Sequence, residues 1–130
     1  MIRQFTLGKQ ERLKSRKQIE HLFNEGKNFS IAPFRIHYSI RKSAMPPMQF
    51  GVGVSTKNFK KAVDRNRIKR MVREAYRLQK FLLYQKLNET KGQLIVFFIF
   101  NGKEIPAYHE ITEKMKMILD KLAGFTDSSK

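Results

Sequence analysis

Strict alternation of apolar and polar residues marks two strands in the first half of the chain. In residues 34–41 (FRIHYSIR) every second residue from Phe34 onward is apolar, and the residues between are polar. Residues 48–55 (MQFGVGVS) repeat this two-residue period, which is typical of a β-strand with one buried face. A turn with two prolines separates the segments, so we expect them to pair as an antiparallel hairpin. Residues 27–30 (KNFS) are compatible with a further short strand.

A third strand is predicted for residues 93–100 (QLIVFFIF), which have almost no polar face. A strand that is apolar on both sides belongs in the interior of a sheet. Asn101 and Gly102 suit the end of this strand.

The first helix is predicted from Arg16 to Glu25. Ser15 and Gln18 can form a capping box at its start, and Gly26 suits a left-handed stop. Its apolar stripe consists of Ile19, Leu22 and Phe23.

The last helix is predicted to start near Pro106, a residue suited to a first turn, and to end at Gly124. Its buried stripe consists of Tyr108, Ile111, Met115, Ile118 and Leu122.

A longer helix is predicted between the second and third strands, from within residues 61–64 to about Lys80. At about 100° per residue, apolar residues gather on one side and cations on the other. The apolar side contains Ile68, Met71, Val72, Ala75, Leu78 and Leu82. The cationic side contains Arg65, Lys69, Arg70, Arg73, Arg77 and Lys80. We expect the apolar side to pack on the sheet and the cations to form a ladder, with little relief from Glu74.

This order of elements predicts one α/β (α+β) domain over residues 1–130, with a single mixed sheet covered by helices. Residues 1–10 and 125–130 are expected to be flexible, as chain ends often are.

Charge is concentrated in one part of the chain. The formal net charge is +16, yet residues 101–130 are neutral, with five cations and five acidic residues. Residues 57–80 carry ten Lys/Arg against two acidic residues, a net +8. So large a local excess favours a polyanionic partner, nucleic acid first and an anionic membrane surface second.

The spacing of the cations in the long helix favours the nucleic acid. Like charges four residues apart, as in Arg65, Lys69, Arg73 and Arg77, destabilise a helix by roughly 0.2–0.5 kcal/mol per pair. A merely solvated face would alternate its signs. The planar fork of arginine suits phosphate.

The cellular compartment is suggested by three features. The chain has no cysteine, so disulfides and thiolate metal sites are excluded. Its beginning lacks the apolar core of a signal peptide. The apolar run from Leu94 to Phe100 is too short to cross a bilayer. We therefore expect a soluble, cytoplasmic protein.

The polar side of the first predicted strand offers a second binding surface. Arg35, His37, Ser39 and Arg41, beside Gly51 and Gly53, could give flat ground for a single-stranded backbone. Ile19 and Phe23 would either wall such a cleft or belong to the core.

Catalysis by the protein itself is not favoured. Of the three histidines, only His21 and His37 could converge as an acid–base pair, and His109 is expected to be exposed. Glu110 and Glu113 are helical neighbours without further ligands, so no protein-held metal is expected.

Residues 62–77 (AVDRNRIKRMVREAYR) resemble the arginine-asparagine-arginine signature of the protein component of bacterial ribonuclease P. The resemblance extends to residues 12–27 (RLKSRKQIEHLFNEGK), to residues 50–55 (FGVGVS), and to the strand and helix that follow the signature.

The resemblance implies that the protein does not perform the chemistry. In that family a catalytic RNA, with magnesium ions held by the RNA, removes the 5′ leader of precursor tRNA. No protein-bound cofactor, membrane or further protein partner is implied. The residues matched to catalytic-RNA binding are Arg65, Asn66, Arg67, Lys69, Arg70 and Arg73. Those matched to a cleft for the single-stranded leader are Ile19, Phe23, Arg35 and His37.

The family fold implied is α-β-β-β-α-β-α, ribosomal-protein-like, with a left-handed β-α-β crossover, whereas pattern reasoning alone favours a right-handed one. The chain departs from the family where Ile19 replaces a usual aromatic residue and His37 a common tyrosine. The loop at residues 57–61 is also one residue longer than in many relatives.

Two other classes of protein stay open. One is a ribosomal or other structural RNA-binding protein without a processing role, which would share the charge and the α/β architecture. The other is an amphipathic membrane binder.

Overall fold

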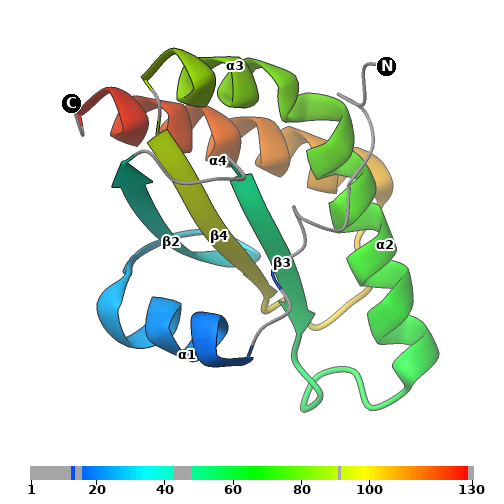
Figure 1. Ribbon diagram of the computed structural model, residues 1–130. Coiled ribbons are helices and arrows are strands. Elements are labelled where there is room, and N and C mark those ends of the chain that lie inside the picture. The colour runs from blue at the N-terminus through cyan, green and yellow to red at the C-terminus, as the bar shows by residue number, and fades with distance from the viewer. Residues whose placement is uncertain (1–12, 14–15, 43–47, 91, 129–130) are drawn as a thin grey trace, which may run out of the picture.

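The computed structural model describes residue 13 and residues 16–42, 48–90 and 92–128 (Figure 1). The expectations for residues 1–10, for the capping residue Ser15 and for the two-proline turn concern segments outside the described residues. In chain order the elements are α1 (Arg16–Glu25), β1 (Lys27–Ile31), β2 (Phe34–Lys42), β3 (Met48–Val54), α2 (Ala62–Gln79), α3 (Phe81–Thr90), β4 (Gly92–Phe100) and α4 (Tyr108–Ser128).

The described strands form one mixed sheet in the order β1-β2-β4-β3. β1 and β2 are antiparallel, β2 and β4 are antiparallel, and β3 runs parallel to β4. The predicted mixed sheet and its interior apolar strand are therefore confirmed. The β-α-β crossover is also present, because the parallel neighbours β3 and β4 are connected through α2 and α3 (Figure 1).

The expected antiparallel hairpin of β2 and β3 is wrong, because β4 lies between these strands. Val96 of β4 is level with Tyr38 on one side and with Phe50 on the other. Alternation shows which face of a strand is buried but not which strand lies beside it. β4 is apolar on both faces and takes the central place. The hairpin that does form joins β1 to β2, with a cis bond between Ala32 and Pro33.

The main core lies between one face of the sheet and the layer of α2, α3 and α4, while α1 packs on the other face (Figure 1). The predicted alternation holds, since Phe34, Ile36 and Tyr38 of β2 face this core. Even-numbered residues of β4 do the same, and odd-numbered Ile95 and Phe97 lie under α1.

Two helices, α3 and α4, differ from expectation. α3 was not predicted as a separate helix, because no glycine or proline breaks the pattern after Lys80. α4 continues through Gly124 to Ser128, so the expectation that it stops at Gly124 is wrong. The ring of Phe125 stacks on Tyr38 at 5.0 Å and 2°, which ties this last turn to the sheet.

Gly26 ends α1 for a different reason from the one expected, since no described glycine has a positive φ. A Cβ atom at Gly26 would lie 2.5 Å from the carbonyl oxygen of Leu22 and 2.9 Å from that of Tyr38. The residue is needed there because the chain passes close to its neighbours.

Candidate nucleic-acid interface

α2 presents one buried and one exposed side, but the buried side is rotated from the predicted one. Its buried residues are Ile68, Val72, Ala75 and Tyr76. Tyr76, which the helical wheel did not place in the apolar arc, stacks on Phe50 with ring centroids 4.0 Å apart and an angle of 10°. Leu78, which was expected to be buried, is 47% exposed.

The basic face of α2 is the exposed side, and we define it by Asn66, Arg67, Arg70 and Arg73. All four side chains are exposed, and Lys69 lies half-buried at the edge. These are five of the six residues matched to catalytic-RNA binding, so the structure brings them together on one helix surface.

Arg65, the sixth matched residue, is half-buried, and its side chain is bound to the backbone of the protein. Its Nη1 donates to the backbone oxygens of Phe59 at 2.7 Å and Lys60 at 2.9 Å. These bonds hold the loop that precedes α2 and give two of its carbonyl groups a donor.

The far end of the expected ladder is also altered. Lys80 is 1% exposed, and its Nζ lies 5.9 Å from the centre of the Tyr76 ring, so it does not belong to the basic face. Arg77 pairs with the Glu74 carboxylate, so Glu74 relieves the charge more than expected. The surface available to a polyanion is therefore the first three turns of α2.

The loop before α2 is tied to the loop after β4. The side-chain amide of Asn58 donates to the backbone oxygens of Asn101 and Gly102, both at 3.3 Å. The start of α2 is thus held against the end of the central strand, which fixes where the basic face begins.

An aromatic cluster lies between α1 and the open face of the sheet. Phe23 of α1 lies 4.4 Å from the ring of His37 on β2 and meets Phe97 of β4 edge-on at 5.5 Å and 69°. Phe23 is 40% exposed, so it is not a core residue. Ile19 is half-buried and packs with Phe97 against the small cluster of Leu13, Leu22 and Ile95.

Phe97 is a member of this surface that sequence reasoning missed. It was assigned to an all-apolar strand, yet its ring covers the two glycines of β3. A Cβ atom at Gly51 would lie 2.6 Å from Cδ1 of Phe97, and one at Gly53 would lie 3.2 Å from its Cε2. The expectation that these glycines offer open ground beside β2 is therefore wrong. In the sequence, two glycines on the same face of one strand, Gly51 and Gly53, could have indicated that a large side chain of a neighbouring strand lies against them.

The surroundings of His37 favour its uncharged form. Burial lowers the pKa of its imidazole below 6.5, and the nearby Arg35 guanidinium lowers it further. Its Nδ1 is buried and has no hydrogen-bond partner among the described residues. Arg35 is exposed and donates to Oδ1 of Asn28 on β1 at 3.3 Å. Thus Ile19, Phe23, Arg35 and His37 all border one side of α1.

The candidate acid–base pair is not assembled. His37 packs against Phe23, whereas His21 lines a pocket with Ser39 and Arg41 beside α1. Residues two apart on a helix point about 200° from each other, so His21 and Phe23 lie on opposite flanks of α1. The described residues also contain no group of three or more His, Cys, Asp or Glu that could hold a metal ion.

A small α+β protein with an exposed basic helix and an aromatic-lined open sheet face is typical of RNA-binding proteins. The model of the Ribonuclease P family matches residues 7–123 of this chain. The chain therefore belongs to the ribonuclease P protein family.

Individual relatives agree with this assignment. The chain is 39% identical over 128 residues to the ribonuclease P protein component of Porphyromonas gingivalis, with 96% of this chain and 92% of the relative covered. It is 40% identical over 123 residues to that of Dictyoglomus thermophilum, with 95% and 97% covered.

Solved structures give the same fold. The RNase P protein from Thermotoga maritima superposes with a TM-score of 0.66 at 28% identity, covering 85% of this chain and 96% of that one. The Staphylococcus aureus protein, at 18% identity, also gives a TM-score of 0.66, which supports the fold alone. No helix among the described residues is long and apolar enough to span a membrane.

Proposed function

We propose that this chain binds the catalytic RNA of a ribonuclease P holoenzyme through the basic face of α2. The observation that carries this proposal is the exposure of Asn66, Arg67, Arg70 and Arg73 on one side of a helix in a chain of net charge +16. Guanidinium forks on a rigid helix suit phosphate oxygens at fixed positions.

The second part of the proposal concerns the substrate. The aromatic cluster of Phe23, His37 and Phe97 holds the single-stranded 5′ leader of precursor tRNA, with Arg35 beside it. A half-exposed ring is placed to stack on a base, a contact worth about 1–3 kcal/mol per base. Because mature tRNA has no leader, this contact favours the precursor.

The chemistry is assigned to the RNA subunit. Magnesium ions would be held there by phosphate oxygens, which are the hard ligands that this ion prefers. The protein would supply binding and position, with the catalytic RNA and precursor tRNA as its partners, no further protein required, and the cytoplasm as its location.

Reconstitution with catalytic RNA and precursor tRNA tests the proposal. The expected result is 5′ cleavage that the protein stimulates at moderate magnesium concentration. The control is the quadruple variant Asn66→Ala, Arg67→Gln, Arg70→Gln and Arg73→Gln, which keeps the buried face of α2 intact and is expected to lose the stimulation. A protein without effect on cleavage by the catalytic RNA would instead support a structural RNA-binding role.

A further inference from the structure

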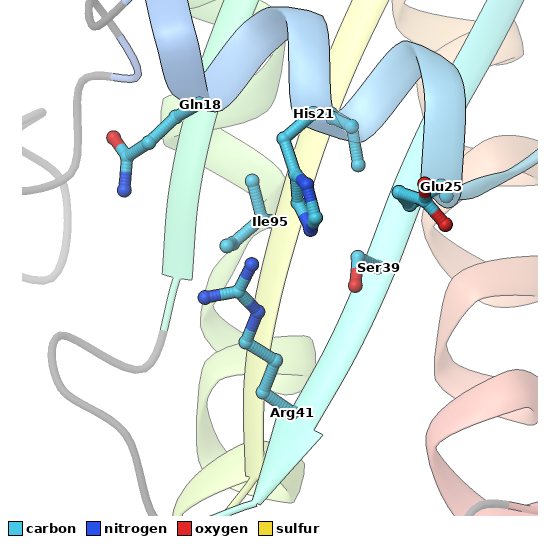
Figure 2. Close-up of a pocket in the computed structure, with 8 residues that line it drawn as sticks. Gln18, His21, Glu25, Ser39, Arg41 and Ile95 are labelled. Carbon is cyan, nitrogen blue, oxygen red and sulfur yellow. The ribbon is translucent and has the colours of Figure 1, made fainter.

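α1 divides the open face of the sheet into two halves. Leu22 points down onto Ile95 and anchors the helix. Phe23 lies on one flank with the aromatic cluster. His21 lies on the other flank, above the pocket that Figure 2 shows. The proposed leader site uses only the first flank, so the second flank is without an assigned role.

The second flank contains a small pocket of about 20 Å³ that opens to solvent. Gln18, His21 and Glu25 of α1 line it from above, and Ser39 and Arg41 of β2 from below. Figure 2 shows the Arg41 side chain rising from the end of β2 until its guanidinium lies beneath α1 near Ile95. Leu22 of α1 and Ile95 of β4 add apolar side chains to its lining.

Three donor side chains of this pocket, those of His21, Ser39 and Arg41, have no partner among the described residues. No hydrogen bond or ion pair engages any of the three within that part of the chain. By contrast, Arg35, Arg65 and Arg77 each have a partner in the fold. An arginine fork, an imidazole and a hydroxyl that converge without partners form an arrangement suited to an oxyanion.

We propose that His21, Ser39 and Arg41 bind a phosphodiester group of an RNA strand. This inference rests on the proposed function, which supplies the RNA. Glu25 is the one carboxylate lining the pocket, and Figure 2 places it at the opposite end from the Arg41 guanidinium. A single carboxylate also makes this a poor site for a divalent cation, which prefers several oxygen ligands.

The pocket lies within reach of an RNA strand that occupies the aromatic cluster. Ser39 and Arg41 follow His37 on the same face of β2, at roughly 7 and 13 Å by the rise per residue of a strand. A leader that passes over α1 would bring a phosphate to Arg41. The alternative source of the same group is the backbone of the catalytic RNA.

The test compares Arg41→Gln with Lys116→Gln in the reconstituted holoenzyme. Both variants remove one positive charge from an exposed side chain, but Lys116 lies on α4, away from the pocket. Binding is measured to catalytic RNA alone, and to precursor tRNA with leaders of increasing length. Unfolding curves check that both variants are folded, as the exposure of both side chains leads us to expect.

Arg41→Gln is expected to weaken binding about tenfold, the usual effect of losing a hydrogen bond to a charged group. The slope of log binding constant against log salt concentration is expected to become shallower by about 0.7 if the lost contact is to a single strand. A loss that appears only with long leaders identifies the leader as the source, and a loss with catalytic RNA alone identifies the subunit. Ser39→Ala is expected to weaken the same interaction to a smaller extent.

Two outcomes would overturn the inference. One is that Arg41→Gln binds both RNAs as tightly as the parent protein, and the other is that Lys116→Gln loses as much affinity as Arg41→Gln. If the parent protein fails to stimulate cleavage, the proposed function itself is wrong. If the parent protein stimulates cleavage and Arg41→Gln binds RNA equally well, only the proposal of a phosphate site is wrong.

Discussion

The ring of Phe97 on β4 lies against the bare backbone of Gly51 on β3. A Cβ atom at Gly51 would lie 2.6 Å from Cδ1 and 2.9 Å from Cε1 of that ring. The two residues are level with each other across the parallel pair of strands. Phe97 can take this position only because residue 51 is a glycine without a side chain. The edge-on contact between Phe97 and Phe23 depends on the same glycine.

Gly51→Ala is expected to displace Phe97 and to reduce the free energy of unfolding by about 1–3 kcal/mol, the usual cost of overpacking. Affinity for precursor tRNA is expected to fall as well, because the ring that supports Phe23 moves. Urea unfolding and precursor binding are the two measurements. A variant with parental stability and affinity would show that the ring can move without consequence.

Gly124→Ala is the matched control, because a Cβ atom there meets no atom within 4 Å. Gly124 lies inside α4, where alanine is favoured over glycine. The free energy of unfolding is expected to rise by roughly 0.5–1 kcal/mol. Urea unfolding measures it, and a loss of stability would contradict the helical placement of this residue.

The sequence predicts the faces of the elements better than their neighbours. The alternation of β2 correctly separates Ile36, in the core, from His37, on the open face. It cannot show that β4 inserts between β2 and β3, because pairing depends on contacts between distant residues. Phe97 was missed for the same reason, since its role appears only when the glycines of β3 lie beside it.

The candidate RNA-binding residues show the same limit. The helical wheel finds Arg70 and Arg73 on the exposed side of α2, but it puts Lys80 there too. Lys80 is buried because the chain turns into α3 at that point and Tyr76 lies beneath it. Neither the turn nor the bonds that Arg65 makes to preceding carbonyls can be read from a periodic pattern.

Arg70→Ala and Arg65→Ala are expected to differ in stability although both weaken binding to the catalytic RNA. Arg70 is exposed on the basic face, so its loss lowers the salt slope of binding by roughly 0.7–0.9 per phosphate contact. Loss of Arg65 also leaves the Phe59 and Lys60 carbonyls without their donor. This is expected to lower the free energy of unfolding by about 0.5–1.5 kcal/mol. Salt titrations of binding and urea unfolding separate the two effects. An equal stability of both variants would contradict the anchoring role of Arg65.

Phe23→Ala is expected to weaken binding of precursor tRNA about 5- to 150-fold, the equivalent of one lost stacking contact, and to leave mature tRNA unaffected. The half-exposed ring contributes little to the core, so the variant is expected to stay folded. Affinities for both RNAs measure the difference. An equal loss of affinity for precursor and mature tRNA would show that Phe23 does not bind the leader.

The stability of the protein is expected to depend on pH through His37. Its pKa in the folded state is lowered from 6.5, by burial first and by Arg35 second. Below pH 6.5 the unfolded chain therefore binds a proton that the folded protein resists, and the free energy of unfolding falls. The loss begins near pH 6.5, grows as the pH falls and stops below the folded-state pKa.

His37→Phe keeps an aromatic ring beside Phe23 and removes the titration. Urea unfolding of both proteins between pH 8 and pH 5 gives the difference in stability as a function of pH. The free energy of unfolding of the variant is expected to rise relative to that of the parent as the pH falls below 6.5, because a phenyl ring binds no proton. At every pH the variant also lacks the unpaired buried Nδ1. A difference that stays constant across this range would mean that the His37 imidazole takes up its proton as easily in the folded protein as in the unfolded chain.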